Sequence, residues 1–252
     1  MERNKARDIL AFSLGIILIG CLIWAAGQIR NDRLVFPDVT EILRAFLRLI
    51  RTPRTYLLIW TSLKHLLAAM AVSTVIGIAI GLAEGFSDFV RALFKPLMIM
   101  LRSIPMVVLT VVIMVITKYD RVPLIGTALI LIPMISEAAC EGCRRIDPDL
   151  IDVYRLYSDF NPQVLRMVYL PMMAGYLKQA YISAVGMGMK LVISTEYLVQ
   201  TRNSLGKAIN SSAYFNEYQE IYAYALIMIL LVVVIGDLPI WISRLLTHKE
   251  IR

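Results

Sequence analysis

The feature that most constrains this chain is a series of long apolar segments separated by short charged ones. A helix needs about 20 mostly apolar residues to cross the hydrocarbon core of a bilayer. Apolar residues make up 58% of the 252 residues and charged residues 18%, whereas soluble domains average about 45–50% and 25%. Because the apolar excess is concentrated in blocks, the sequence predicts an all-α membrane protein and not a large water-soluble core.

Six apolar segments qualify as membrane helices. The first, 9–27, follows a polar start that carries Arg3, Lys5 and Arg7. No small-residue cleavage site ends it, so we interpret it as a retained helix and not as a signal peptide. The other segments are expected at about 57–83, 93–117, 122–136, 172–195 and 221–243.

Polar and small residues within these segments indicate helices that pack around protein or water. The third segment carries Arg102 between two prolines, and the fifth carries Lys190. Both charges are costly in hydrocarbon, so lipid alone cannot surround these helices. Gly77 and Gly81 form a GxxxG pattern, which lets helix backbones approach closely.

Segment 37–54 is amphipathic, with apolar residues at helical spacing and arginines between them. Pro37 and Asp38 favour a helix start at its beginning. We interpret the segment as an interfacial helix that lies on the membrane. The alternative is a plain solvated connector helix.

The net charge of +7 does not indicate nucleic-acid binding. The basic residues are spread along the chain and flank the apolar segments, where they suit lipid headgroups, and they form no basic face. Lysine and arginine divide almost evenly between the two predicted sides of the membrane, so charge alone does not fix the orientation.

No metal or redox site is predicted. Cys140 and Cys143 form a lone CxxC, which lacks the second pair of a zinc ribbon and the strand of a redox motif. We interpret them as two small side chains one helical turn apart. His65 and His248 are isolated in the sequence and suggest no metal or catalytic geometry.

The segment 137–171, EAACEGCRRIDPDLIDVYRLYSDFNPQVLRMVYLP, is too charged to lie in lipid. Asp147-Pro148 and Asn161-Pro162 each combine an N-cap residue with proline at the first helical position. Apolar positions follow each pair at helical spacing. The segment therefore predicts short helices on the membrane surface, with one face available for a partner.

The ends of this segment resemble the EAA signature of bacterial ABC importer permeases. The resemblance implies a type I importer permease fold with six transmembrane helices, in the inner membrane, with both termini cytoplasmic. It also implies that the segment is the cytoplasmic coupling helix that docks into the ATPase subunit. The residues expected to couple to the ATPase are Glu137, Ala138, Ala139, Gly142, Leu170 and Pro171.

Other motifs extend the resemblance over about 57–243, and they are similar to the nitrate/sulfonate/taurine branch, which includes importers of vitamin precursors. Two stretches in the middle of the signature segment, Val153-Tyr154 and Asp159-Phe160-Asn161, depart from the family pattern, so the ATPase socket is expected to differ in detail. The matching motifs are Thr61-Ser62-Leu63 with Gly77, Gly81 and Gly85; Pro96-Leu97 with Arg102-Ser103-Ile104-Pro105; and Thr195-Glu196-Tyr197-Leu198 with Ser204-Leu205-Gly206.

The resemblance implies partners and a division of labour. The chain would pair with a second permease subunit, two ABC ATPase subunits and an extracytoplasmic binding protein. It would hold no cofactor and perform no catalysis, since ATP and Mg²⁺ bind the ATPase. Residues 1–56 would form the first span and the interfacial helix, 57–245 the permease core and 246–252 a cytoplasmic tail. An ion-coupled transporter, a membrane enzyme or an exporter permease are the alternatives.

Several polar or adaptable residues are candidates for the pathway. Methionine suits a cavity that must change shape, and Lys190 suits an anionic solute. Ordinary helix packing is the alternative for each of them. Glu196 is expected at the outer end of the fifth span, where it would hold a gate or, alternatively, be solvated. The pathway candidates are Thr110, Met114, Ser183, Met187, Lys190 and Ser194.

Overall fold

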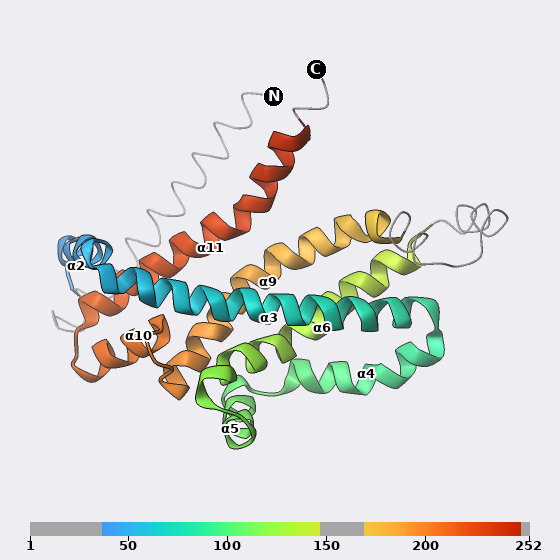
Figure 1. Cartoon of the computed structure of the whole chain (residues 1–252), viewed down its shortest axis with the longest axis horizontal. Coiled ribbons are helices and arrows are strands. Elements are labelled where there is room, and N and C mark those ends of the chain that lie inside the picture. The colour runs from blue at the N-terminus through green and yellow to red at the C-terminus, as the bar shows by residue number, and fades with distance from the viewer. Residues whose placement is uncertain (1–36, 147–168, 248–252) are drawn as a thin grey trace, which may run out of the picture.

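The structure, a computed structural model, describes residues 37–146 and 169–247, with side chains described as far as Gly236. All regular elements in these ranges are helices, which confirms the all-α prediction for them (Figure 1). In chain order they are α2 (Val39–Arg51), α3 (Pro53–Phe86), α4 (Asp88–Ser103), α5 (Met106–Ile116), the 3-10 turn η1 (Tyr119–Arg121), α6 (Val122–Arg144), α9 (Leu170–Val199), α10 (Leu205–Tyr214) and α11 (Tyr218–Thr247).

Four of these helical stretches are long and apolar enough to cross a membrane: α3, Tyr119–Arg144, α9 and the Tyr218–Gly236 part of α11. The pair α4 and α5 makes a fifth if it is counted as one broken span. The predicted first span, 9–27, lies outside the described residues. The count of six therefore stays a prediction.

The third predicted span, 93–117, is not one continuous helix. Helices α4 and α5 meet at an angle of 103°, and the chain is extended at Ile104 and Pro105 between them. A residue before proline avoids the helical region because it clashes with the proline ring. The break therefore lies at Pro105, whereas Pro96 remains inside α4.

The fourth predicted span, 122–136, ends too early, because α6 continues to Arg144. Glu137 and Gly142 therefore lie in the last turns of this helix, and the prediction that a separate surface segment begins at Glu137 is wrong. The sequence between them contains no proline or other helix-breaking signal, so the helix continues past the apolar block.

Helices α3 and α6 pack at very short distance along three glycines of α3, Gly77, Gly81 and Gly85. A Cβ atom on Gly77 would lie 2.9 Å from the Cβ of Ile135, and one on Gly85 would lie 2.7 Å from the Cβ of Cys143. The glycines of α3 thus permit the close packing that the GxxxG pattern predicts. Cys140 and Cys143 are both free and buried, as small packing residues of α6.

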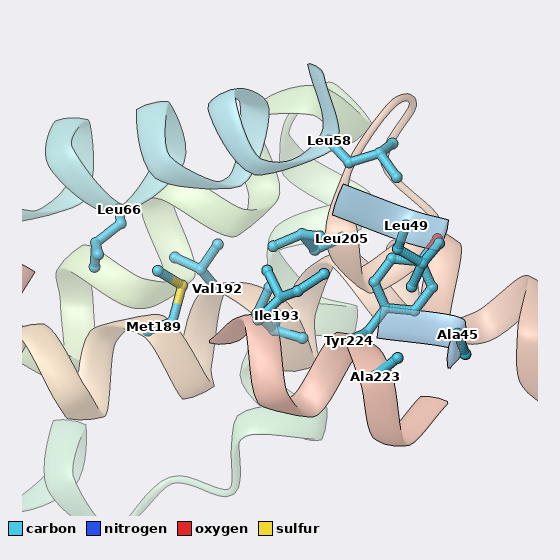
Figure 2. Packing of buried hydrophobic residues seen from close by; sticks show 11 residues of the cluster. Ala45, Leu49, Leu58, Leu66, Met189, Val192, Ile193, Leu205, Ala223 and Tyr224 are labelled. Atoms are coloured by element: carbon cyan, nitrogen blue, oxygen red, sulfur yellow. The ribbon is translucent and has the colours of Figure 1, made fainter. Parts of the chain in front are cut away.

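Helix α2 packs on the bundle through one face. Its start carries the predicted N-cap, Asp38, in a capping box with Glu41. Ala45 and Leu49 are buried in a core with Tyr224 and other residues of α3, α9, α10 and α11 (Figure 2). The helix is therefore more than a solvated connector. Its placement at a membrane interface stays a prediction.

The described helices come together at two ends of the structure, which we call the signature end and the α10 end (Figure 1). At the signature end, α3 turns into α4, α6 finishes and α9 begins. At the α10 end, α2, the start of α3, the end of α9 and α10 come together.

Candidate functional site

The signature end holds both borders of the signature segment at one place. Ile146 and Tyr169, the described residues on either side of 147–168, are buried in the same cluster as Met173. A Cβ atom on Gly142 would lie 3.0 Å from the Cα of Met173. The chain therefore leaves α6 and returns to α9 at a single point. The middle of the segment, 147–168, lies outside the described residues.

The six predicted coupling residues occupy different environments. Ala139 and Gly142 are buried between helices, so their small size serves the packing of α6 against α3 and α9. Glu137 and Pro171 are exposed. Ala138 and Leu170 are half-buried.

Two ion pairs join α4 to α6 at the signature end. Arg102 Nη2 donates to Glu137 Oε2 at 2.7 Å and to the carbonyl of Pro133 at 3.0 Å. Arg144 Nη1 donates to Asp88 Oδ1 at 2.6 Å. We call this pair of contacts the α4 clamp. The sequence marks Arg102 as a charge that is costly in lipid and as part of a family motif, but it does not identify the partner of Arg102.

A charged groove of about 520 Å³ lies between α4 and α6 beside the clamp. At its base, Ser136 Oγ donates to the buried carboxylate of Glu84 at 3.1 Å. Arg91 and Lys95 also line the groove. Charges of both signs gather here next to the signature residues.

At the α10 end, the carboxylate of Glu196 is completely buried. It accepts hydrogen bonds from Ser62 Oγ at 2.7 Å and from the backbone N–H of Gly206 at 3.2 Å, and His65 Nδ1 lies 2.7 Å from its other oxygen. Ser62 Oγ in turn accepts from the N–H of Leu205 at 3.0 Å. We call this network the Glu196 anchor.

The local sequence brings α10 into the anchor. Gln200 and Asn203 adopt left-handed backbone conformations, with φ of 55° and 54°, and turn the chain back after α9. Ser204 caps α10 by accepting from the N–H of Lys207 at 3.2 Å. Gly206 is required because a Cβ atom there would lie 2.5 Å from the Cβ of Glu196.

The Glu196 anchor corrects one expectation. The solvated alternative for Glu196 is wrong, because α3 and α10 cover its side chain. His65, which is isolated in the sequence, pairs with this residue 131 positions away. No local pattern signals a partner at such a separation. The sequence signal for this contact was the presence of two family motifs, Thr61-Ser62-Leu63 and Glu196 with Gly206, which the structure brings together.

The geometry of the anchor suits a structural joint and not nucleophilic chemistry. In a hydrolase triad the imidazole lies between the hydroxyl and the carboxylate. Here the carboxylate of Glu196 is the hub, and both Ser62 and His65 bond to it. The three donors therefore fix one carboxylate that ties α3, α9 and α10 together.

Four of the predicted pathway residues share one exposed face of α9. They follow a helical spacing of four, three and four residues, so they form a single stripe. The α9 stripe consists of Ser183, Met187, Lys190 and Ser194.

The other two pathway candidates lie on α5. Met114 is half-buried in a cluster with Leu191 and Val199 of α9. Thr110 is completely buried and donates to the carbonyl of Met106 at 2.7 Å. The structure therefore does not bring Thr110 to the exposed surface that the α9 stripe forms.

Comparison with known proteins gives a family and a fold. A family model described as "Binding-protein-dependent transport system inner membrane component" matches residues 40–251. A chain from a structure of inward-facing conformations of the MetNI methionine ABC transporter is 21% identical, with a TM-score of 0.56. The match covers 73% of this chain and 95% of that one, and shows a shared fold. A comparison with curated protein sequences finds no match.

Proposed function

The chain belongs to the family of binding-protein-dependent transport inner membrane components, the permeases of ABC importers, and from this premise we propose that it forms half of a solute pathway. It is a multi-pass protein of the inner membrane. Its partners are a second permease subunit, two ATPase subunits and an extracytoplasmic binding protein. ATP and Mg²⁺ bind the ATPase subunits.

The observation that supports this proposal best is that the two borders of the signature segment are packed together. Ile146 and Tyr169 lie in one buried cluster, and a Cβ atom on Gly142 would lie 3.0 Å from the Cα of Met173. A force applied to the segment 147–168 is therefore delivered to α6 and α9 together. A coupling element needs this rigid attachment, because it must convert movement of the ATPase into movement of membrane helices.

The mechanism is a shift between two conformations. The loaded binding protein presents its solute to the outer opening, at the α10 end. ATP binding closes the two ATPases and draws the signature segments together, which turns the pathway outward. Hydrolysis resets it. In this arrangement the signature end and both termini are cytoplasmic.

The α9 stripe is the proposed wall of the pathway, with Met114 beside it on α5. A lysine facing lipid is costly, and Lys190 is exposed and forms no ion pair with any described side chain. Protein or a water-filled pathway must therefore cover this face in the assembly. The cation favours a small anionic or polar solute, of the nitrate, sulfonate, taurine or vitamin-precursor class.

Glu196 is proposed to hold the outer gate in a fixed position. Its anchor joins the end of α9, which carries the stripe, to α3 and α10. The end of the pathway wall is thereby tied to the helices around it.

Co-purification with the ATPase tests the proposal. The full chain is co-expressed with an ATPase subunit encoded beside it, and the tagged permease is isolated in detergent. We expect Glu137→Arg, which reverses an exposed charge at the signature end, to reduce ATPase recovery. Asp120→Arg, an equal charge change on the exposed turn η1, is the matched control. Equal recovery for both variants, or no recovery with the native chain, contradicts the proposal.

A further inference from the structure

Helix α4 has few buried side chains, and two ion pairs join it to α6. Its only buried side chain is Met98, while Phe89, Leu93 and Leu97 are exposed. The clamp pairs Asp88–Arg144 and Arg102–Glu137 lie at the two ends of the helix. These two ion pairs therefore connect α4 to α6 where few side chains of α4 are buried.

Arg102 makes the more specific of the two contacts. Its guanidinium reaches both the carboxylate of Glu137 and the carbonyl of Pro133, one helical turn earlier. Two acceptors on consecutive turns fix the guanidinium against the helix, since the planar donor group has defined directions. A shift or rotation of the end of α6 would therefore carry Arg102 with it.

Arg102 also lies next to the bend in the broken span. It is the penultimate residue of α4, and α5 begins at Met106 after the 103° turn. Beyond the bend, α5 packs on α6 and α9 through Leu109 and Ile113. A displacement of Arg102 therefore acts on the bend at which α5 begins, and α5 packs against α9, which carries the stripe.

The exposure of this pair suits a contact that changes between conformations. The side chains of Arg102 and Glu137 are 45% and 62% exposed. Exposed ion pairs contribute little to folding stability. The Arg102–Glu137 pair can therefore break and form again without unfolding the protein, unlike a buried pair.

We propose that Arg102 is a positioning residue that transmits movement of the signature end, through Glu137, to the α4–α5 bend. The Asp88–Arg144 pair holds the far end of α4 on α6, so that α4 acts as a lever. This inference rests on the proposed function, in which the segment after Glu137 follows the ATPase.

The test uses the complete complex of permease and ATPase in detergent or nanodiscs. Hydrogen–deuterium exchange of residues 106–116 is compared between the nucleotide-free complex and the complex trapped with ATP and vanadate. In the native complex we expect the exchange rates of α5 to differ between the two states. In Arg102→Gln we expect the ratio of the exchange rates in the two states to move toward one. The expected change in this ratio is roughly 2- to 30-fold, as for mutations that change the coupling between two sites.

Three further variants make the result specific. Arg102→Lys keeps the charge and one donor, and we expect it to retain most of the native response. Glu137→Gln removes the same ion pair from the other helix and, in complexes that retain the ATPase, should reproduce Arg102→Gln. Arg121→Gln, which removes an exposed cation from η1, should leave the response native. ATPase co-purification and hydrolysis are measured for each variant, to show that the complex is intact.

The outcomes separate the two levels of the proposal. A native response of α5 in Arg102→Gln, in a complex that still hydrolyses ATP, overturns the role of Arg102 and leaves the proposed function standing. A native chain that does not retain the ATPase overturns the proposed function, and this inference with it. Loss of response in Arg121→Gln as well would show an unspecific effect and would also contradict the assignment.

Discussion

The Glu196 anchor, at the α10 end, and the α4 clamp, toward the signature end, are both built around carboxylates. Each holds a carboxylate against donors from another helix at 2.6–2.7 Å. They differ in burial: Glu196 is fully covered, whereas Glu137 is 62% exposed. A buried charge without its partners is strongly unfavourable, whereas an exposed pair competes with water and gains little. The anchor is therefore expected to fix structure, and the clamp to permit movement.

The largest effect is expected from Glu196→Ala. The substitution leaves Ser62, His65 and the N–H of Gly206 without their acceptor in the interior. We expect a loss of about 3–5 kcal/mol of stability, as for other broken buried networks. Thermal unfolding of the purified chain, followed by size-exclusion chromatography, measures it. A melting temperature within experimental error of the native value would show that the anchor does not fix the α10 end.

A smaller loss is expected from His65→Ala. Glu196 then keeps two donors, Ser62 and Gly206, so only one hydrogen bond to a charged group is removed. Such a bond is worth about 1.5–3 kcal/mol. The same thermal assay applies, and Lys64→Ala, at the neighbouring position on α3, is the control. A loss as large as that of Glu196→Ala would mean that His65, and not the carboxylate, is the hub.

For the clamp, the expected change in stability is small. Asp88→Asn and Arg102→Gln each remove one partly exposed ion pair, which is typically worth about 0.2–1 kcal/mol. Denaturation of both single variants and of the double variant measures the loss of unfolding free energy for each pair and for both pairs together. A loss above about 2 kcal/mol for either single variant would place the clamp with the anchor as a structural joint.

The smallest effect is expected from salt. Raising the ionic strength from about 0.1 M to 1 M shortens the screening length from about 10 Å to 3 Å. This weakens the exposed clamp pairs but leaves the buried anchor nearly unchanged. The stability difference between Arg102→Gln and the native chain should therefore shrink in high salt, while that of Glu196→Ala should persist. Equal salt sensitivity of the two variants would remove the distinction between the regions.

The signature end shows how far local patterns can be followed. The residues Glu137-Ala138-Ala139 and Gly142 pointed to the family that the family model shows. The pattern did not show that they lie inside a membrane helix, because a charged stretch can continue a helix beyond the apolar block. Nor did it show that Ala139 and Gly142 are buried between helices, since small residues suit a docking surface and a helix crossing equally.

Sequence alone determined the helical class, the spans that became α3, α9 and α11 to within a few residues, and the glycine face of α3. These depend on hydrophobic periodicity and backbone preference, which act over neighbouring positions. Only the tertiary structure decided that Glu196 meets His65 and that Arg102 meets Glu137, pairs 131 and 35 positions apart. Their contact depends on the register and angle at which whole helices pack, and no short stretch of sequence specifies that geometry.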